Sequence, residues 1–181
     1  MAEDEKEKKA LLAKSEISLL LDTYDDIFSD FDPRPYSQRA LSDDFLNEAR
    51  KASREKGESF ELRFLMYARS RSSEHESVIK KRLHEHFKKH TAVLRKEIEN
   101  IMIKGVVLAV LGFVMMVGAT VIAEFITKSL LSNFLMVVLE PSGWFAVWMG
   151  FDSIFSVPKE KKPELVFNEK MSKADIIFES Y

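Results

Sequence analysis

Acidic side chains are concentrated between residues 22 and 32, where carboxylates on an irregular loop could bind a divalent cation. Magnesium and calcium are the ions that such oxygen ligands favour. The spacing lacks the central glycine and terminal glutamate of a calcium-binding loop, and capping, turn formation or ion pairs with Arg34 and Arg39 explain it equally well. A metal site and a structural cluster are both open interpretations of Asp22, Asp25, Asp26, Asp30 and Asp32.

Two histidines form a second candidate metal site, because His86 and His90 are one helical turn apart and could share a zinc ion. Lysines beside them disfavour a bound cation, and solvated histidines are the alternative. The chain contains no cysteine, which excludes disulfides and cysteine nucleophiles. No serine elbow, phosphate-binding loop or dinucleotide-binding glycine pattern occurs either. The sequence therefore predicts no enzyme and no cofactor apart from the divalent cation considered above.

Averaged over the whole chain, the composition is that of a soluble protein, but the charges are distributed unevenly along it. The 181 residues are 46% hydrophobic and 31% charged, with a net charge of −2, which disfavours a strongly basic nucleic-acid-binding protein. Residues 105–123 carry no charge and would span about 28 Å as a helix, close to the thickness of a bilayer core. Lys104 and Glu124 flank this segment. We therefore expect a transmembrane helix here.

A second apolar segment covers residues 130–157 and predicts a returning span, so that 105–157 forms a transmembrane hairpin. Pro141 should kink this helix, and Trp144 and Trp148 are typical of a membrane interface, as is Lys104. The alternative is one span followed by an interfacial helix, because Glu140 makes insertion costly. Gly112 and Gly118 are six residues apart rather than four, so the common dimerisation motif of membrane helices is absent.

Acidic residues in or beside the apolar segments are candidates for a pore or a membrane-buried site. Glu140 lies near the middle of the second segment, whereas Asp152 and Glu124 lie nearer the ends of the spans. A ring of such carboxylates in an oligomer could line a path for cations. The structural alternative is a neutral carboxylic acid at position 140 that bonds backbone groups freed by Pro141.

Basic residues predict the orientation of the hairpin. They flank the outer ends of both spans, whereas the link between the spans carries only Lys128. The positive-inside rule then places both termini in the cytoplasm. The first sixteen residues lack an apolar core, so no signal peptide is expected there. The flanking basic residues are Lys80, Lys81, Arg82, Lys88, Lys89, Arg95, Lys96 and Lys104 before the hairpin, and Lys159, Lys161 and Lys162 after it.

The polar parts of the chain predict a small cytoplasmic α/β module over residues 16–72, preceded by a charged, flexible segment, 1–15. Alternation predicts strands from Ile17 and over 60–66, with a helix from Ser42 to about Lys56 that stops at Gly57. Strand, helix and strand in succession predict a parallel pair. Two strands make a marginal sheet, so a further strand must come from the tail or from a neighbouring subunit.

From about Ser73 an apolar stripe at helical spacing predicts an amphipathic helix over 73–104 that continues into the first span, to Phe125. The stripe packs either on a second copy of the chain or on the module itself. The tail, 158–181, should begin as an exit loop at Pro158 and Pro163 and become helical from Ser172. The stripe consists of Ile79, Leu83, Phe87, His90, Leu94, Ile98 and Ile101.

Several segments resemble a family of small, uncharacterised prokaryotic membrane proteins with two transmembrane segments. The resemblance rests on DTYDDIFSDFDPRPYSQRALSDDFL, IKKRLHEHFKKH and the LEPSGWF of the second span, and it covers the chain from Ile17 onward. It implies a multi-pass protein of the inner membrane, and it carries no assigned activity or catalytic residue.

These observations predict a mainly α membrane protein: a two-helix transmembrane hairpin, a long helix extending into the cytoplasm, and a small N-terminal β-α-β-like module. The expected function is that of a homo-oligomeric ion channel or pore-type effector, with the lipid bilayer and further copies of the chain as partners. The first alternative is a membrane-anchored scaffold whose module binds a cytoplasmic protein. The second is a membrane-tethered, metal-dependent hydrolase that uses the aspartate cluster.

Overall fold

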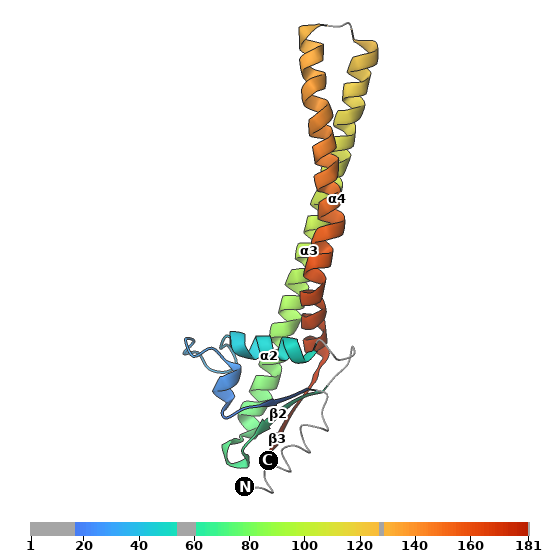
Figure 1. Ribbon diagram of the computed structural model, residues 1–181. Helices are drawn as coiled ribbons and strands as arrows, with labels where there is room; N and C mark the ends of the chain where they lie inside the picture. The colour runs from blue at the N-terminus through green and yellow to red at the C-terminus, as the bar shows by residue number, and fades with distance from the viewer. Residues whose placement is uncertain (1–16, 54–60, 127–128, 181) are drawn as a thin grey trace. The chain divides into compact units, whose positions relative to one another are not determined.

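The computed structural model describes residues 17–53, 61–126 and 129–180, and these residues are mostly helical. The segment 1–15, predicted to be flexible, lies outside the described residues, as does Lys128 of the link between the spans. Helices and strands therefore account for most of the chain that the structure describes (Figure 1).

The chain divides into two compact units. The first, called the module here, combines Met1–Thr91 with Val166–Tyr181, and the second, called the hairpin, is Ala92–Leu165. Two long helices contribute to both units: α3 (Ser73–Phe125) and α4 (Leu130–Lys173). Each unit has its own packing.

A three-stranded parallel sheet lies at the centre of the module. Its strands are β1 (Ile17–Leu20), β2 (Glu61–Met66) and β3 (Asp175–Ser180), in the order β1-β2-β3. Phe64 is central, because it lies opposite Leu19 on one side and Phe178 on the other. The two strands predicted from alternation and their parallel pairing are confirmed.

Alternate residues of β2 supply the middle of the module's core. Leu62, Phe64 and Met66 are each 0% exposed, as expected for residues that share one face of a strand. The apolar stripe of α3 enters the same core through its first three positions, whereas the next one, His90, is exposed. The beginning of the stripe thus packs on its own module, as one of the two interpretations expected. Those three positions are Ile79, Leu83 and Phe87.

Helix α2 (Asp43–Ser53) begins where the sequence predicts. The Ser42 carbonyl accepts the first backbone hydrogen bond, from the Leu46 N–H at 3.0 Å, and two aspartates follow at the positive end of the helix dipole. Phe45 and Ala49, one turn apart, are buried in the core. The stop predicted at Gly57 falls in residues 54–60, outside the described part of the chain.

The exit loop predicted at Pro158 and Pro163 is wrong, because α4 continues through both prolines to Lys173. Each internal proline removes a backbone hydrogen bond and costs an isolated helix about 3 kcal/mol. Burial of Phe167 and Met171 in the module's core offsets this cost, at about 2 kcal/mol for each side chain. α4 also continues through Pro141, where the kink stays a prediction.

The end of the chain is a strand, so the helix expected from Ser172 is wrong. Ile176 and Phe178 alternate with exposed or half-buried residues, and both are buried beside β2. Arg63 of β2 also forms an ion pair with Glu179, with 2.5 Å between nitrogen and oxygen. The third strand therefore comes from the tail of the same chain, which was one of the two predicted origins, and not from a neighbouring subunit.

Candidate functional site

Glycines bring α3 and α4 into backbone contact within the hairpin, where the two helices lie antiparallel (Figure 1). A Cβ atom added at Gly112 would lie 2.6 Å from the carbonyl oxygen of Gly143. One added at Gly150 would lie 2.7 Å from the carbonyl oxygen of Gly105. Ordinary contacts between such atoms need about 3.5 Å, so no larger residue fits without a shift of backbone. We call these four positions the glycine seam.

The spacing of the glycine seam was the signal that the sequence analysis missed. Gly105 and Gly112 are seven residues apart, as are Gly143 and Gly150, so each pair lies on one face of its helix. The comparison of Gly112 with Gly118 was misleading, because a Cβ at Gly118 meets nothing within 4 Å. Small residues at such positions allow helices to approach closely.

The outer surface of the hairpin is apolar. Within the described part of the chain, two helices, α3 and α4, are long and apolar enough to cross a membrane, and only 11% of the most apolar stretch of each is buried. Large side chains such as Phe113, Val137 and Phe145 are between 64% and 71% exposed. Trp144 and Trp148, the predicted interface residues, are 59% and 67% exposed. The hairpin therefore presents to its surroundings the residue types that a soluble protein buries.

The polar residues proposed for the membrane site lie on this outer surface rather than between the helices. Glu140, Asp152, Glu124 and Lys104 are all exposed. Within the ranges that the structure describes, the Glu140 carboxyl group has no hydrogen-bond partner. Asp152 lines a shallow pocket of about 190 Å³ together with aromatic residues of α4. A single hairpin thus encloses none of these carboxylates, and a site built from them needs something outside the hairpin.

In the module, the aspartate cluster is engaged in caps, turns and ion pairs. The Asp26 carboxylate accepts hydrogen bonds from the backbone N–H groups of Asp22 and Thr23, at 2.8 and 3.0 Å, and so caps the short helix Tyr24–Ile27. Asp25 forms an ion pair with Nη1 of Arg39. The Nη2 atom of the same guanidinium lies 3.9 Å from a carboxylate oxygen of Asp30. These contacts match the structural interpretation of the cluster.

Asp32 closes the loop that follows the short helix. Its carboxylate accepts hydrogen bonds from the Arg34 guanidinium at 2.7 Å and from the backbone N–H of Ala40 at 2.7 Å. These bonds hold the pKa of Asp32 far below its usual range, chiefly through Arg34 and then through Ala40. Among the residues that the structure describes, no group of three or more acidic or histidine side chains could hold a metal ion. The hydrolase alternative therefore gains no metal-binding geometry from this loop.

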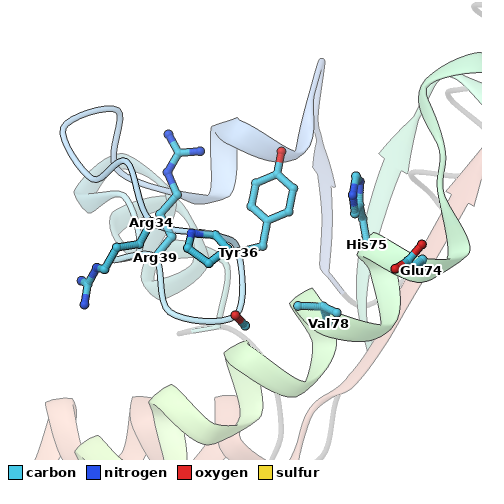
Figure 2. Close-up of a pocket in the computed structure, with 8 residues that line it drawn as sticks. Arg34, Tyr36, Arg39, Glu74, His75 and Val78 are labelled. Carbon is cyan, nitrogen blue, oxygen red and sulfur yellow. The ribbon is translucent and has the colours of Figure 1, made fainter.

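A pocket of about 470 Å³ opens beside the aspartate loop, at the start of α3. Figure 2 shows Tyr36 and His75 among its lining residues; their rings pack edge to face, with 5.4 Å between ring centroids. Both of its arginines are already paired with aspartates, so the pocket is not an uncompensated cationic site. Its lining is Arg34, Pro35, Tyr36, Ser37, Arg39, Glu74, His75 and Val78.

A buried polar network supports one wall of this pocket. The Tyr24 hydroxyl donates to the Glu76 carboxylate at 3.1 Å and accepts from the Ser72 N–H at 2.8 Å. Arg71 donates to the same carboxylate at 2.8 Å. Burial favours the neutral acid, but Arg71 outweighs it, and the pKa of Glu76 is lowered. The network fixes the start of α3 against the short helix that contains Tyr24.

The histidines of α3 have separate surroundings. Both ring nitrogens of His84 lie 3.0 Å from backbone carbonyl oxygens, those of Lys80 and Ala174, so both bonds form together only when the ring carries two protons. The rings of His86 and His90 are 4.2 Å apart. No third ligand joins them within the described ranges, and the predicted zinc site stays a prediction.

We expect the module to lose stability in acid through His86. Burial, and then the charges of His90, Arg82 and Lys89, lower the pKa of His86 to about 4, from 6.5. The unfolded chain therefore binds the extra proton first, so the contribution is complete above about pH 6.5 and disappears as the pH falls to about 4. Urea unfolding followed by near-ultraviolet circular dichroism measures this slope. The variant His86→Gln should flatten it, and an unchanged slope in that variant would assign the acid sensitivity to other groups.

Comparisons with protein-family models, with curated proteins and with solved structures found no match for this chain. The resemblance to small prokaryotic membrane proteins therefore stays a prediction. The structure establishes a mostly helical chain with two long apolar helices and a small parallel sheet.

Proposed function

We propose that this chain is an integral membrane protein whose hairpin crosses the bilayer twice and whose module lies in the cytoplasm. The observation that carries the proposal is the exposure of large apolar side chains on the outer surface of the hairpin. In water such a surface would be an aggregation hazard, whereas in lipid it needs no further partner. The helices satisfy their own backbone groups, as spanning segments must.

The distribution of charge supports an orientation with both ends on the cytoplasmic side. Lysines and arginines are frequent in α3 before Lys104 and in α4 after Val157, at the same end of the hairpin. The opposite end carries Glu124 among the described residues. Retention of the chain in the membrane fraction after an alkaline wash tests insertion, and its release into the supernatant would refute it.

We further propose that the protein acts as a homo-oligomer, with Glu140 in a cation path or at a contact between copies. A carboxyl group on the lipid-facing side of a span is costly unless protein or water covers it. A single hairpin leaves Glu140 exposed, so the missing cover must come from outside the hairpin. An assembly of identical copies would place a ring of these groups around a common axis.

The variant Glu140→Gln should reduce cation flux through proteoliposomes severalfold, because it removes the charge but keeps a polar side chain of similar size. Glu160→Gln, on the same helix but in the charged segment beyond the span, is the matched control and should conduct as the original protein does. Equal flux in all three proteins, together with an intact oligomer, would count against a role of Glu140 in permeation.

A scaffold function is the second candidate, favoured by the pocket that Tyr36 and His75 line and by Phe31. The Phe31 side chain, on the loop beside this pocket, is 98% exposed. An aromatic residue in such a position is a typical anchor for a protein partner. The size of the protein in detergent separates the candidates, because a monomer with two spans cannot enclose a pore.

A further inference from the structure

A row of residues on the outer side of α4 repeats with the spacing of a helix–helix contact. The steps between its members are four, three, four, three and four residues, so all of them lie along one face of the helix. We call this row the α4 stripe. It consists of Asn133, Val137, Glu140, Trp144, Val147 and Phe151.

The α4 stripe lies beside the contact with α3 and meets it at Val147, whose backbone nitrogen would lie 2.7 Å from a Cβ atom at Gly112. Gly143 and Gly150 face α3, and at about 100° per residue they lie about 60° and about 80° around the helix from Glu140. Val137, Trp144 and Phe151 are 71%, 59% and 50% exposed. The stripe is therefore a second face of α4, and the hairpin itself covers only its half-buried member, Val147.

The α4 stripe combines apolar side chains with two polar ones that lipid cannot satisfy. Asn133 and Glu140 are seven residues apart, both are exposed, and neither side chain has a hydrogen-bond partner among the described residues. Phe145 and Met149, on the other exposed side of the same helix, are fully apolar side chains that lipid can cover. Polar side chains of this kind form hydrogen bonds between helices in membranes.

We propose that the α4 stripe is the contact between copies of this chain, with Asn133 and Glu140 of one copy meeting the same residues of the next. This inference rests on the proposed insertion in the membrane. Copies inserted with one orientation place these residues at equal depth. A carboxamide both donates and accepts hydrogen bonds, so Asn133 can pair with its own counterpart. At position 140, two carboxyl groups can share one proton in a single hydrogen bond, which leaves one negative charge on the pair. A polar residue in such a row also fixes the register between helices.

Disulfide cross-linking in membranes tests this contact, because the chain contains no cysteine of its own. The variants Val137→Cys and Val138→Cys differ by one residue in depth, but only the first lies on the α4 stripe. After oxidation we expect about tenfold more cross-linked dimer from Val137→Cys, since a disulfide needs Cα atoms within about 7 Å. Trp144→Cys and Phe145→Cys form a second pair with the same expectation.

Each outcome decides the inference separately from the proposed oligomer. Cross-linking at Val137 but not at Val138 supports the α4 stripe. Cross-linking at Val138 and Phe145 instead would overturn it while leaving a homo-oligomer in place. A protein that is monomeric in mild detergent and forms no cross-link at any position would overturn both.

Among variants of the α4 stripe, Glu140→Gln should keep the dimer, because the amide also donates and accepts hydrogen bonds. Glu140→Leu should weaken the dimer, because leucine does neither.

Discussion

The variant Gly112→Leu should lose the close packing of the hairpin. A side chain at this position would push α3 away from the backbone of α4, because even its Cβ atom would lie 2.6 Å from the Gly143 carbonyl oxygen. Overpacking of this kind costs about 3 kcal/mol at the upper end of the usual range, and a rigid backbone neighbour places this site there. Titration with dodecyl sulfate, followed through the fluorescence of Trp144 and Trp148, measures the free energy of unfolding.

The matched control is Gly118→Leu, in the same helix and with the same change of residue. A Cβ atom at Gly118 meets nothing within 4 Å, so the additional side chain can project into the surroundings of the hairpin. We expect this variant to unfold at nearly the same detergent concentration as the original protein. If both variants were destabilised equally, helix propensity or insertion would explain the loss, and the glycine seam would not.

The variant Phe64→Ala should unfold the module. Phe64 is 0% exposed in the central strand, with its ring 5.0 Å from that of Phe178 and 6.0 Å from that of Phe45. Truncation of such a buried ring costs about 3–5 kcal/mol. In hydrogen-exchange mass spectrometry the amides of β2 should therefore exchange about a hundred to several thousand times faster.

Phe31→Ala is the control for this truncation, because the same ring is removed from a side chain that is 98% exposed. Its effect on stability should be within about 0.5 kcal/mol, as for other surface substitutions. Slow exchange of β2 in the Phe64→Ala variant would mean that the core around the sheet contributes little to the stability of the module.

The long elements of this fold could be predicted because their signals are strong and local. The boundaries of α3, Ser73 and Phe125, agree with the sequence prediction, since an apolar stripe at helical spacing leads without a proline into an uninterrupted apolar segment. The alternation in β2 and the serine cap before α2 were similarly clear. These patterns depend on neighbours a few residues away, which the sequence contains directly.

The end of the chain could not be predicted because tertiary contacts override its local signals. Pro158 and Pro163 disfavour a helix, but α4 continues through them to place Phe167 and Met171 in the module's core. The short segment Asp175–Ser180 gains its partner, β2, from more than a hundred residues earlier. Neither contact can be read from residues nearby in the sequence.

The residues of the candidate sites could be named from the sequence, but the contacts that they make in space could not. Asp25, Asp26 and Asp32 do lie close in sequence, yet each engages a different partner, because short loops use carboxylates for caps and turns. The pocket lined by Tyr36 and His75 combines residues of a loop with residues at the start of α3, and no spacing rule links those positions. Heptad spacing of glycines was the one available signal that was overlooked.

The most direct test of the central claim is the accessibility of single cysteines on the two sides of a membrane. The variants Leu130→Cys, at the start of α4, and Phe31→Cys, in the module, place a thiol on side chains that are 89% and 98% exposed. In spheroplasts of a bacterial host, a membrane-impermeant maleimide should label Leu130→Cys at once and Phe31→Cys only after the membrane is permeabilised. Equal labelling of both cysteines before permeabilisation, or recovery of the chain in the soluble fraction, would contradict a hairpin that crosses the bilayer.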